Sequence, residues 1–379
     1  GSDWSSDVCS SDLKSMKKMF ASLLALSMVL VGCGSGGGDS EDKTPEIALV
    51  TDQGTISDKS FNQSAWEAVE EYGDKNEVGT KYYKPSSFDT AGYTQQIENA
   101  IENGAKIVVC PGYKFNQTIA NIQNEYPDVS FILIDGTPAE AEETPAEPAK
   151  NVYCAKYEEA QPGYLAGYAA VKEGYTKLGF MGGISLPAVI NYGYGYLQGA
   201  NDAAKELGIQ VEVKYTYTGS FNESPDIQSK AAGWYNTGTE IIFSCGGQIC
   251  NSIFAAAEQT NKMTIGVDSD QKDASQTVLT SAMKGVKKTV ADEIAAVYAG
   301  TFEGGLHILN AEGDYVGLSD DFSRFKKFTQ TDYEKVFETV KNETVKIITN
   351  DDVEKDAQGD PNTKTLKDVL TNVTVSYEK

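Results

Sequence analysis

Short apolar runs alternate along the chain with segments of helical periodicity. The run at residues 47–50 ends in a polar turn, and the segment after it carries apolar residues at helical spacing. The alternation continues through strand and helix patterns at residues 80–83, 93–101, 106–110, 116–126 and 129–134. This order predicts βα units that build a parallel sheet.

A second series of the same units follows. After a strand at residues 151–157 and a helix at 161–172, its strand patterns lie at 178–181, 211–217, 240–244 and 263–267, and its helices at 195–207 and 253–259. The two series predict an α/β protein with two Rossmann-like lobes and parallel sheets. We place the N-terminal lobe at residues 45–158 and the C-terminal lobe at 159–276.

The last hundred residues are expected to return largely to the N-terminal lobe. They carry a strand pattern at 277–281, an amphipathic helix after Lys284 and a strand-like run at 345–348, within the segment 277–379. Repeated crossing between lobes predicts a multi-strand hinge. Clefts between lobes are favoured ligand sites, and hinge closure around a ligand is their usual motion.

The N-terminus resembles an export signal. We interpret residues 1–15 as a non-native leader and residues 16–33 as a lipoprotein signal peptide, with two lysines, an apolar run and small residues before Cys33. The apolar run falls short of the roughly 20 residues that span a membrane. We expect residues 34–44 to be a flexible tether. The protein is then expected to be extracytoplasmic and lipid-anchored through Cys33 to the bacterial cell membrane.

Composition excludes several classes of function. A net charge of −23 argues against a nucleic-acid partner, because such binding depends on basic side chains that neutralise phosphates. The chain has one histidine, His307, and lacks the phosphate-loop and nucleophile-elbow motifs, so we predict no catalytic residue, metal site or cofactor. Cys245 and Cys250 are expected to be buried thiols, and residues 137–150 an exposed insertion.

Polar and small residues recur where the predicted strands end. They are Asp52, Asp135, Gly182, Gly183, Phe221, Gly246, Gly247 and Asp268. Each residue type also favours turns, but the carboxyl ends of parallel strands share one edge of a sheet, where ligands bind. Carboxylates accept hydrogen bonds from hydroxyl groups, aromatic rings stack on flat ligands, and glycines allow close approach. A hydroxylated ligand with a flat ring fits all three.

Several motifs resemble the basic membrane protein family, the lipid-anchored substrate-binding proteins similar to purine nucleoside receptor A. They are Thr51-Asp52, the run from Asp58 to Trp66, the run from Tyr164 to Ala170, Gly219-Ser220-Phe221, the run from Gly266 to Gln271, and Leu279-Thr280-Ser281 through Lys284. The resemblance covers about residues 47–288. It implies the periplasmic-binding-protein type I fold and a monomer that delivers purine nucleosides (inosine, guanosine or adenosine) to an ABC transporter permease.

The resemblance also implies roles for individual residues. Phe61 and Phe221 would sandwich the base, and Asp135 would contact it. Asp268 and Lys284 would hold ribose hydroxyls, and Asp52 and Asn62 would complete the polar shell. Gly246 and Gly247 would approach the ligand through their backbone. Tyr192 and Tyr194 are alternatives to Phe221 as the second aromatic. After Gly246-Gly247 the chain departs from the family pattern, with Gln248-Ile249-Cys250.

Other functions stay open at this point. The main alternative is a binding protein for a sugar or other small polyol, in which Phe61 stacks on a sugar face without an opposing aromatic. A nucleoside hydrolase or phosphatase built on Asp52, Asp268 and Asp270 would require a metal and turnover. A regulatory protein is disfavoured by the export signal. We therefore expect a non-enzymatic receptor that buries its ligand when the lobes close.

Overall fold

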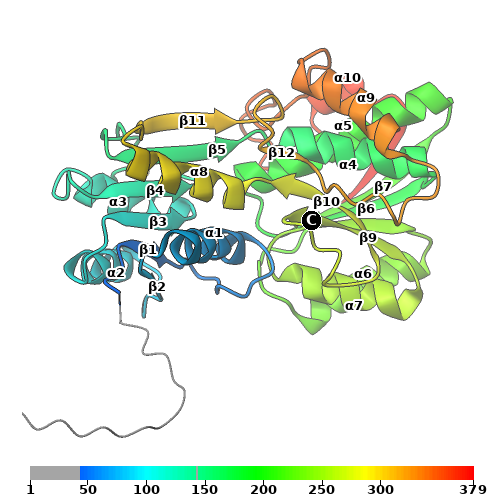
Figure 1. Cartoon of the computed structure of the whole chain (residues 1–379). Coiled ribbons are helices and arrows are strands. Elements are labelled where there is room, and N and C mark those ends of the chain that lie inside the picture. The colour runs from blue at the N-terminus through cyan, green and yellow to red at the C-terminus, as the bar shows by residue number, and fades with distance from the viewer. Residues whose placement is uncertain (1–42, 142–143) are drawn as a thin grey trace, which may run out of the picture. The chain divides into compact units, whose positions relative to one another are not determined.

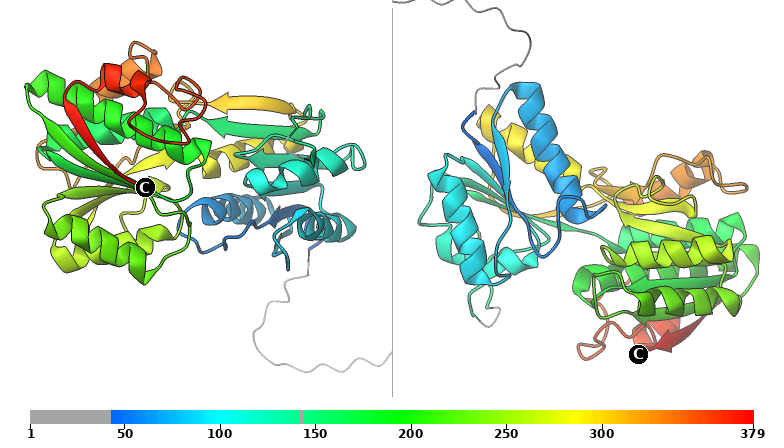
Figure 2. Two further views of the ribbon diagram at one scale, coloured as in Figure 1. Left: turned by 180° about the vertical axis from the view of Figure 1, so that it is seen from behind. Right: turned by 90° about the horizontal axis from the view of Figure 1, so that it is seen from below.

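Two β-sheets organise the part of the chain that the computed structural model describes, residues 43–141 and 144–379 (Figure 1). Each sheet forms the centre of one lobe, with helices on its faces (Figure 2). The predicted α/β class with two parallel-sheet lobes is confirmed. The predicted leader, signal peptide and nearly all of the tether, including Cys33, lie outside the described residues.

The first lobe contains a six-stranded sheet in the order β11-β5-β4-β3-β1-β2, with all neighbours parallel. Its strands are β1 (Ile47–Val50), β2 (Thr80–Tyr83), β3 (Ile107–Pro111), β4 (Ser130–Ile134), β5 (Val152–Tyr157) and β11 (Gly305–Leu309). The central strands read as continuous apolar runs because both faces are buried.

Helices cover the two faces of this sheet in pairs. They are α1 (Phe61–Asn76) and α8 (Val286–Ala299) on one face, and α2 (Thr90–Glu102) and α3 (Asn116–Ile122), with the short helix η1 (Tyr113–Phe115), on the other. The strand period of two divides the side chains, so that Ile47 and Leu49 pack toward α1 and α8 while Ala48 and Val50 pack toward α2 and α3.

The second lobe contains a seven-stranded sheet in the order β12-β10-β9-β8-β6-β7-β13. Its strands are β6 (Lys177–Gly182), β7 (Val211–Tyr217), β8 (Ile241–Cys245), β9 (Met263–Asp268), β10 (Val278–Lys284), β12 (Val316–Leu318) and β13 (Val373–Glu378). Only the pair of β10 and β12 is antiparallel within this sheet. Its helices are α4 (Ala160–Glu173), α5 (Pro187–Leu207), α6 (Pro225–Asn236), α7 (Ile249–Thr260), α9 (Gln330–Lys341) and α10 (Lys364–Val369).

The placement of residues 277–379 differs from the sequence prediction. β10, β12 and β13 all belong to the second sheet, and only α8 and β11 return to the first lobe. The expectation that this segment returns largely to the first lobe is therefore wrong. The remaining domain boundaries stay predictions.

The strand predicted at residues 345–348 is also wrong. Ile348 instead forms two hydrogen bonds with one side chain of α5: its N–H donates to Oε1 of Gln198 at 2.8 Å, and its carbonyl accepts from Nε2 of the same residue at 2.9 Å. Because Gln198 satisfies both backbone groups, this apolar run needs no strand partner.

Three segments connect the lobes: the end of β5 to α4, the end of β10 to α8, and β11 to β12. The hydroxyl of Tyr157, where β5 ends, hydrogen-bonds with that of Thr289 in the first turn of α8 at 2.7 Å. One buried cluster runs from the α1 and α8 face of the first lobe to the α4 and α5 face of the second. The crossings are thus tied to each other and to a shared core.

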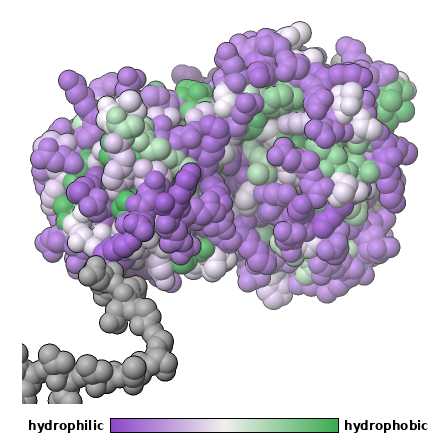
Figure 3. Space-filling model, viewed as in Figure 1, coloured by the Kyte–Doolittle hydropathy of each residue, from purple (hydrophilic) through white to green (hydrophobic). Residues whose placement is uncertain are grey.

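The surface is mostly hydrophilic in the view of Figure 3, with apolar residues scattered between polar ones. Across residues 43–141 and 144–379, none of the helices combines the length and apolar character needed to cross a membrane.

Glycines let α4 and α5 approach each other closely. A Cβ atom on Gly195 or Gly199 of α5 would overlap the carbonyl oxygen of Ala160 or Tyr164 in α4, and one on Gly163 or Gly167 would overlap carbonyl oxygens of α5. Backbone atoms cannot rotate away as a side chain can. Any side chain at these positions therefore pushes the helices apart.

We expect Gly199→Ala to lower the free energy of unfolding by at least about 1–3 kcal/mol, because the added methyl group overpacks this helix interface. Gly233→Ala on α6 is the matched control, since Gly233 is exposed and a Cβ there meets nothing within 4 Å. In that helix alanine should stabilise by about 0.5–1 kcal/mol. Urea unfolding of both variants measures the difference, and equal effects would contradict the close packing of α4 on α5.

Candidate ligand-binding site

The centre of the site is a lysine that is almost completely buried. β10 ends at Lys284, whose side chain is 3% exposed. Its Nζ lies 2.7 Å from Oδ2 of Asp135, which follows β4, and 3.0 Å from Oε1 of Glu159, which precedes α4. A buried charge is tolerated only when paired and hydrogen-bonded, and these carboxylates supply the pairing.

Burial also decides the protonation of this group. Burial alone works to lower the pKa of the Lys284 ammonium, yet Asp135, Glu159 and Asp268 together raise that pKa well above its ordinary value. Lys284 is therefore positively charged at neutral pH.

Three aromatic rings surround the same ammonium group. Nζ of Lys284 lies 5.9 Å from the ring centroid of Phe61, 5.3 Å from that of Tyr157 and 5.7 Å from that of Tyr192. These distances lie within the range of cation–π attraction. Phe61 is the first residue of α1, and Tyr192 belongs to α5, so the rings come from both lobes.

Asp268 connects the lobes through its carboxylate. It ends β9 in the left-handed region, with φ of +66°, a conformation that Asp adopts more readily than most residues. Oδ2 accepts a hydrogen bond from the Ser60 hydroxyl at 2.8 Å, and Oδ1 accepts one from the Tyr192 hydroxyl at 3.2 Å. The carboxylate is thus aimed to receive two hydroxyl donors.

The loop before α1 is held by hydrogen bonds to its own carboxylates. Asp58 accepts from the N–H groups of Ser60 and Asn62 at 2.9 and 3.0 Å. The Asn62 amide donates to Asp58 at 2.9 Å and to Asp52 at 2.8 Å. Asn62 therefore serves first to shape the loop that presents Phe61.

Asp52 lies at the end of this network and keeps one oxygen for other partners. Its Oδ1 accepts from the Gly54 N–H at 2.6 Å as well as from Asn62. Burial raises the pKa of the Asp52 carboxyl, although these two hydrogen bonds act in the opposite direction.

Further contacts close the lobes on each other beside Asp268. The carbonyl of Lys59 accepts from the Ser269 hydroxyl at 2.9 Å and from the Gln271 amide at 3.2 Å. The two lobes therefore touch directly at the carboxyl edges of their sheets.

Phe221, Gly246 and Gly247 form a separate group at the edge of the second sheet. The Phe221 ring packs so closely on Gly183 that a Cβ there would overlap it, and a Cβ on Gly247 would lie 3.4 Å from the Phe221 carbonyl oxygen. Within the described residues, no ring contact or hydrogen bond joins Phe221 to Phe61 or Lys284.

The two alternative tyrosines point to different places. Tyr192 lies in the site, against Asp268 and Lys284. Tyr194 lies away from it, donates to the carbonyl of Asp360 at 3.0 Å and packs with Ile190 and Leu366. Of this pair, only Tyr192 can take part in the site.

Some buried polar atoms at the edge of the first sheet have no hydrogen-bond partner in the described part of the chain. They include Thr51 Oγ1, Asn116 Oδ1 and Asp135 Oδ1. Buried polar groups are nearly always paired, so such atoms point to a polar ligand or to water. A Cβ on Gly136 would overlap Asn116 Oδ1, which places that oxygen beside the loop after β4.

Sequence analysis missed three contributors to the site: Ser60, Tyr157 and Glu159. Ser60 was quoted only as part of a motif. Glu159 lies two residues after the predicted strand at residues 151–157, and this position was the one available signal. The structure brings Phe61, Asp135, Asp268 and Lys284 together as predicted neighbours, pairs Asp52 with Asn62, and groups Phe221 with Gly246 and Gly247.

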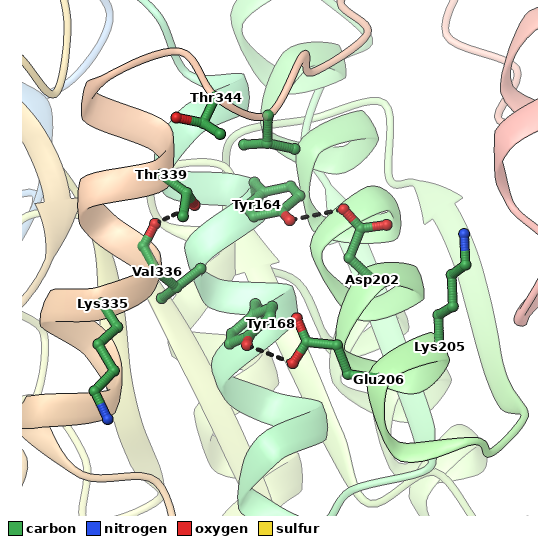
Figure 4. A pocket seen from close by; sticks show the side chains of 10 residues that line it. Tyr164, Tyr168, Asp202, Lys205, Glu206, Lys335, Val336, Thr339 and Thr344 are labelled. Atoms are coloured by element: carbon green, nitrogen blue, oxygen red, sulfur yellow. Dashed lines mark hydrogen bonds between the residues drawn. The ribbon is translucent and has the colours of Figure 1, made fainter.

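A hollow of about 580 Å³ lies elsewhere, between α4, α5 and α9 (Figure 4). Its carboxylates are already engaged, since Tyr164 donates to Asp202 at 2.7 Å and Tyr168 donates to Glu206 at 2.8 Å. Both carboxylates of the hollow therefore have hydrogen-bond partners among the described residues, unlike Oδ1 of Asp135 at the interlobe edge.

Metal and disulfide chemistry find no support in the described residues. Residues 43–141 and 144–379 contain no group of three or more His, Cys, Asp or Glu side chains placed to hold a metal ion. Cys110, Cys154, Cys245 and Cys250 are buried free thiols, as predicted for the last two.

Comparison with known proteins identifies a matching family and several similar proteins. The family described as Bmp, ABC transporter substrate-binding protein PnrA-like, matches residues 46–369. A protein of Lactococcus lactis subsp. cremoris (strain MG1363), named ABC transporter nucleoside-binding protein BmpA, is 29% identical over 343 residues, which cover 82% of this chain and 94% of that protein. Basic membrane protein A1 of Borrelia garinii subsp. bavariensis is 30% identical over 296 residues, covering 76% and 83%.

A solved structure supports the fold. The ABC transporter solute-binding protein of Aeropyrum pernix K1 superposes with a TM-score of 0.72 at 20% sequence identity. The match covers 86% of this chain and 98% of that one. At this identity the likeness concerns the fold alone.

We expect Lys284→Met to lower the free energy of unfolding by about 3–5 kcal/mol near pH 8, because Asp135 and Glu159 would remain buried without a counter-charge. The loss should shrink at pH 5, where these carboxyl groups can take up protons. Urea unfolding at both pH values measures it. Lys288→Met is the control, since Lys288 pairs with Asp292 at the surface and should change stability by less than about 1 kcal/mol. Equal losses in both variants would contradict the central position of Lys284.

Proposed function

Because this chain belongs to the PnrA-like family of ABC transporter substrate-binding proteins, we propose that it captures purine nucleosides at the site around Lys284 and delivers them to an ABC importer. The observation that carries this proposal is the meeting of Phe61, Asp268 and Lys284 at the contact between the lobes.

The hydrogen bonds of Asp268 support a ribose-binding role. Its two carboxylate oxygens each accept from a hydroxyl, one on Ser60 and one on Tyr192. Two neighbouring ribose hydroxyls present the same donors and can replace them. The Lys284 ammonium, which only donates, suits the lone pairs of the same hydroxyl groups.

The aromatic and acidic groups of the first lobe support a base-binding role. Phe61 offers a ring face at the start of α1, and Oδ1 of Asp135 is a buried acceptor without a partner among the described residues. A purine supplies both a flat surface for stacking and N–H donors at its edge. Asp52 adds a second carboxylate at the same sheet edge.

The name of the Lactococcus lactis relative, which includes nucleoside binding, supports the same ligand class. We propose binding without covalent chemistry and without a cofactor. His307 lies on β11 and stacks on Tyr153 with ring centroids 4.0 Å apart, so it has a structural role outside the site.

A sugar or small polyol is the second candidate. Within the described residues, Phe221 makes no ring contact with Phe61, so these two rings do not oppose each other. This favours the sugar or polyol candidate, since one stacking face suffices for a sugar ring. Tyr192 could still oppose Phe61 across a purine.

Isothermal titration of the chain beginning at Lys43 should give one-to-one binding of inosine, guanosine or adenosine. Residues 42–379 form one compact unit, which makes this chain a suitable sample. Phe61→Ala should weaken binding at least about tenfold through lost stacking, and Asp268→Ala more strongly, because lost charge-assisted hydrogen bonds are each worth about 1.5–3 kcal/mol.

Cytidine and ribose serve as the comparison ligands, and Phe322→Ala as the control for removal of an aromatic ring elsewhere. Binding of ribose with no heat from any purine nucleoside would replace the nucleoside proposal by the polyol one. Release of free base would contradict the assignment as a receptor.

We also propose that Cys33 carries a lipid that anchors the protein outside the cell membrane. A single acyl chain anchors only marginally, so more than one chain is needed. In a bacterial host, Cys33→Ser should abolish incorporation of labelled fatty acid and move the protein from the membrane to the soluble fraction. Cys250→Ser, which changes a free thiol of the folded part, is the control and should change neither. Retention of label in Cys33→Ser would disprove this anchor.

A further inference from the structure

Lys284 has two carboxylate partners that differ in where they belong. Asp135 follows β4 of the first sheet, whereas Lys284 ends β10 of the second, so their 2.7 Å ion pair spans the lobes. Glu159 directly precedes the helix α4, which packs on α5 and β10 of the second lobe. The 3.0 Å pair of Glu159 with Lys284 therefore lies within one lobe, so separation of the lobes does not require it to break.

The two carboxylates also differ in how deeply they are buried. The side chain of Glu159 is 6% exposed and that of Asp135 is 21% exposed. In the part of the chain that the structure describes, Oδ1 of Asp135 has no hydrogen-bond partner. Asp135 is thus the more accessible of the two carboxylates, while Glu159 is more deeply buried against Lys284.

We propose that Glu159 is a positioning residue: it holds the Lys284 ammonium toward the ligand hydroxyls while Asp135 exchanges from Lys284 to the ligand. This inference rests on the nucleoside-binding function proposed above. If Glu159 were absent and Asp135 were released, the Lys284 ammonium would have only neutral hydroxyl groups and the already hydrogen-bonded Asp268 as neighbours. An ammonium without a dedicated counter-charge is costly in a low-dielectric site.

The charge of Glu159 changes near neutral pH. Burial raises the pKa of its carboxyl group to about 7, against the opposing effect of Lys284 and with a further increase from Asp135. The other titratable groups that face it are Tyr192 on α5 and Cys245 on β8. Burial raises the pKa of both well above their ordinary values, so neither titrates between pH 6 and 8.

The charge of Glu159 determines the direction in which nucleoside affinity changes with pH. Above the pKa of Glu159 the carboxylate is charged and supports Lys284. Below this pKa the Glu159 carboxyl group is neutral, and Asp135 becomes the main partner of Lys284. The exchange of Asp135 from Lys284 to the ligand then costs more free energy. Nucleoside affinity should therefore fall as the pH drops from 8 to 6, by up to about tenfold, since one pH unit below the pKa leaves about a tenth of the group charged.

The test is titration with adenosine and inosine at pH 6, 7 and 8, since neither base gains a proton in this range. The wild-type protein should lose affinity toward pH 6. Glu159→Gln should bind about tenfold more weakly than the wild type at pH 8 and show no change with pH. Glu158→Gln is the matched control, because Glu158 adjoins Glu159 but faces Glu343, Asp351 and Asp352, and it should follow the wild type.

Two results would overturn the role of Glu159: a Glu159→Gln variant with the wild-type pH profile, or a wild-type affinity that is flat from pH 6 to 8. If Glu159→Gln does not fold, Glu159→Asp keeps the charge and should retain the pH dependence with weaker binding, and a flat profile there would equally overturn the inference. Absence of any purine nucleoside binding by the wild type would instead refute the proposed function.

Discussion

A buried ammonium group needs counter-charges, and much of the arrangement between the lobes follows from that need at Lys284. Its two carboxylate partners lie at the end of β4 and the start of α4, and three aromatic rings enclose it. Removal from water would be prohibitive without these groups. The result is a site in which charge, hydrogen-bond acceptors and ring faces converge from elements far apart in the chain.

The strands β1 to β10 and most helices could be predicted because buried parallel strands appear as short apolar runs between amphipathic segments, whereas β11, β12 and β13 were missed. What the pattern does not contain is the partner of each strand. β10 was recognised as a strand but was placed in the wrong lobe, since its pairing with β9 is decided by three-dimensional packing. The run at 345–348 was taken for a strand because its bonding to Gln198 is invisible in the sequence. The helices α6 and α9 were missed although Ser224 and Thr329 cap them.

The family resemblance identified from motifs is confirmed, and with it Phe61, Asp268 and Lys284 were found as neighbours. These residues lie in local motifs that a sequence displays directly. Glu159 was missed because its importance arises from a contact with a residue distant in the chain, and a glutamate after a strand is otherwise unremarkable. The sequence also could not decide whether Phe221 or Tyr192 is the second aromatic of the site, because the contact of Tyr192 with Asp268 depends on the fold. The ligand roles of all these residues remain proposals.

Because α8 returns to the first lobe, that lobe cannot complete its fold in the order in which the chain is synthesised. α8 covers the same face of the first sheet as α1, and its Val286, Val290 and Ile294 pack in one cluster with Ile47 and Leu49. These residues emerge from the ribosome only after all of α4 to α7 has been made. During synthesis, the lobe that begins first therefore stays half-covered until the other is nearly finished, so the first lobe cannot mature alone.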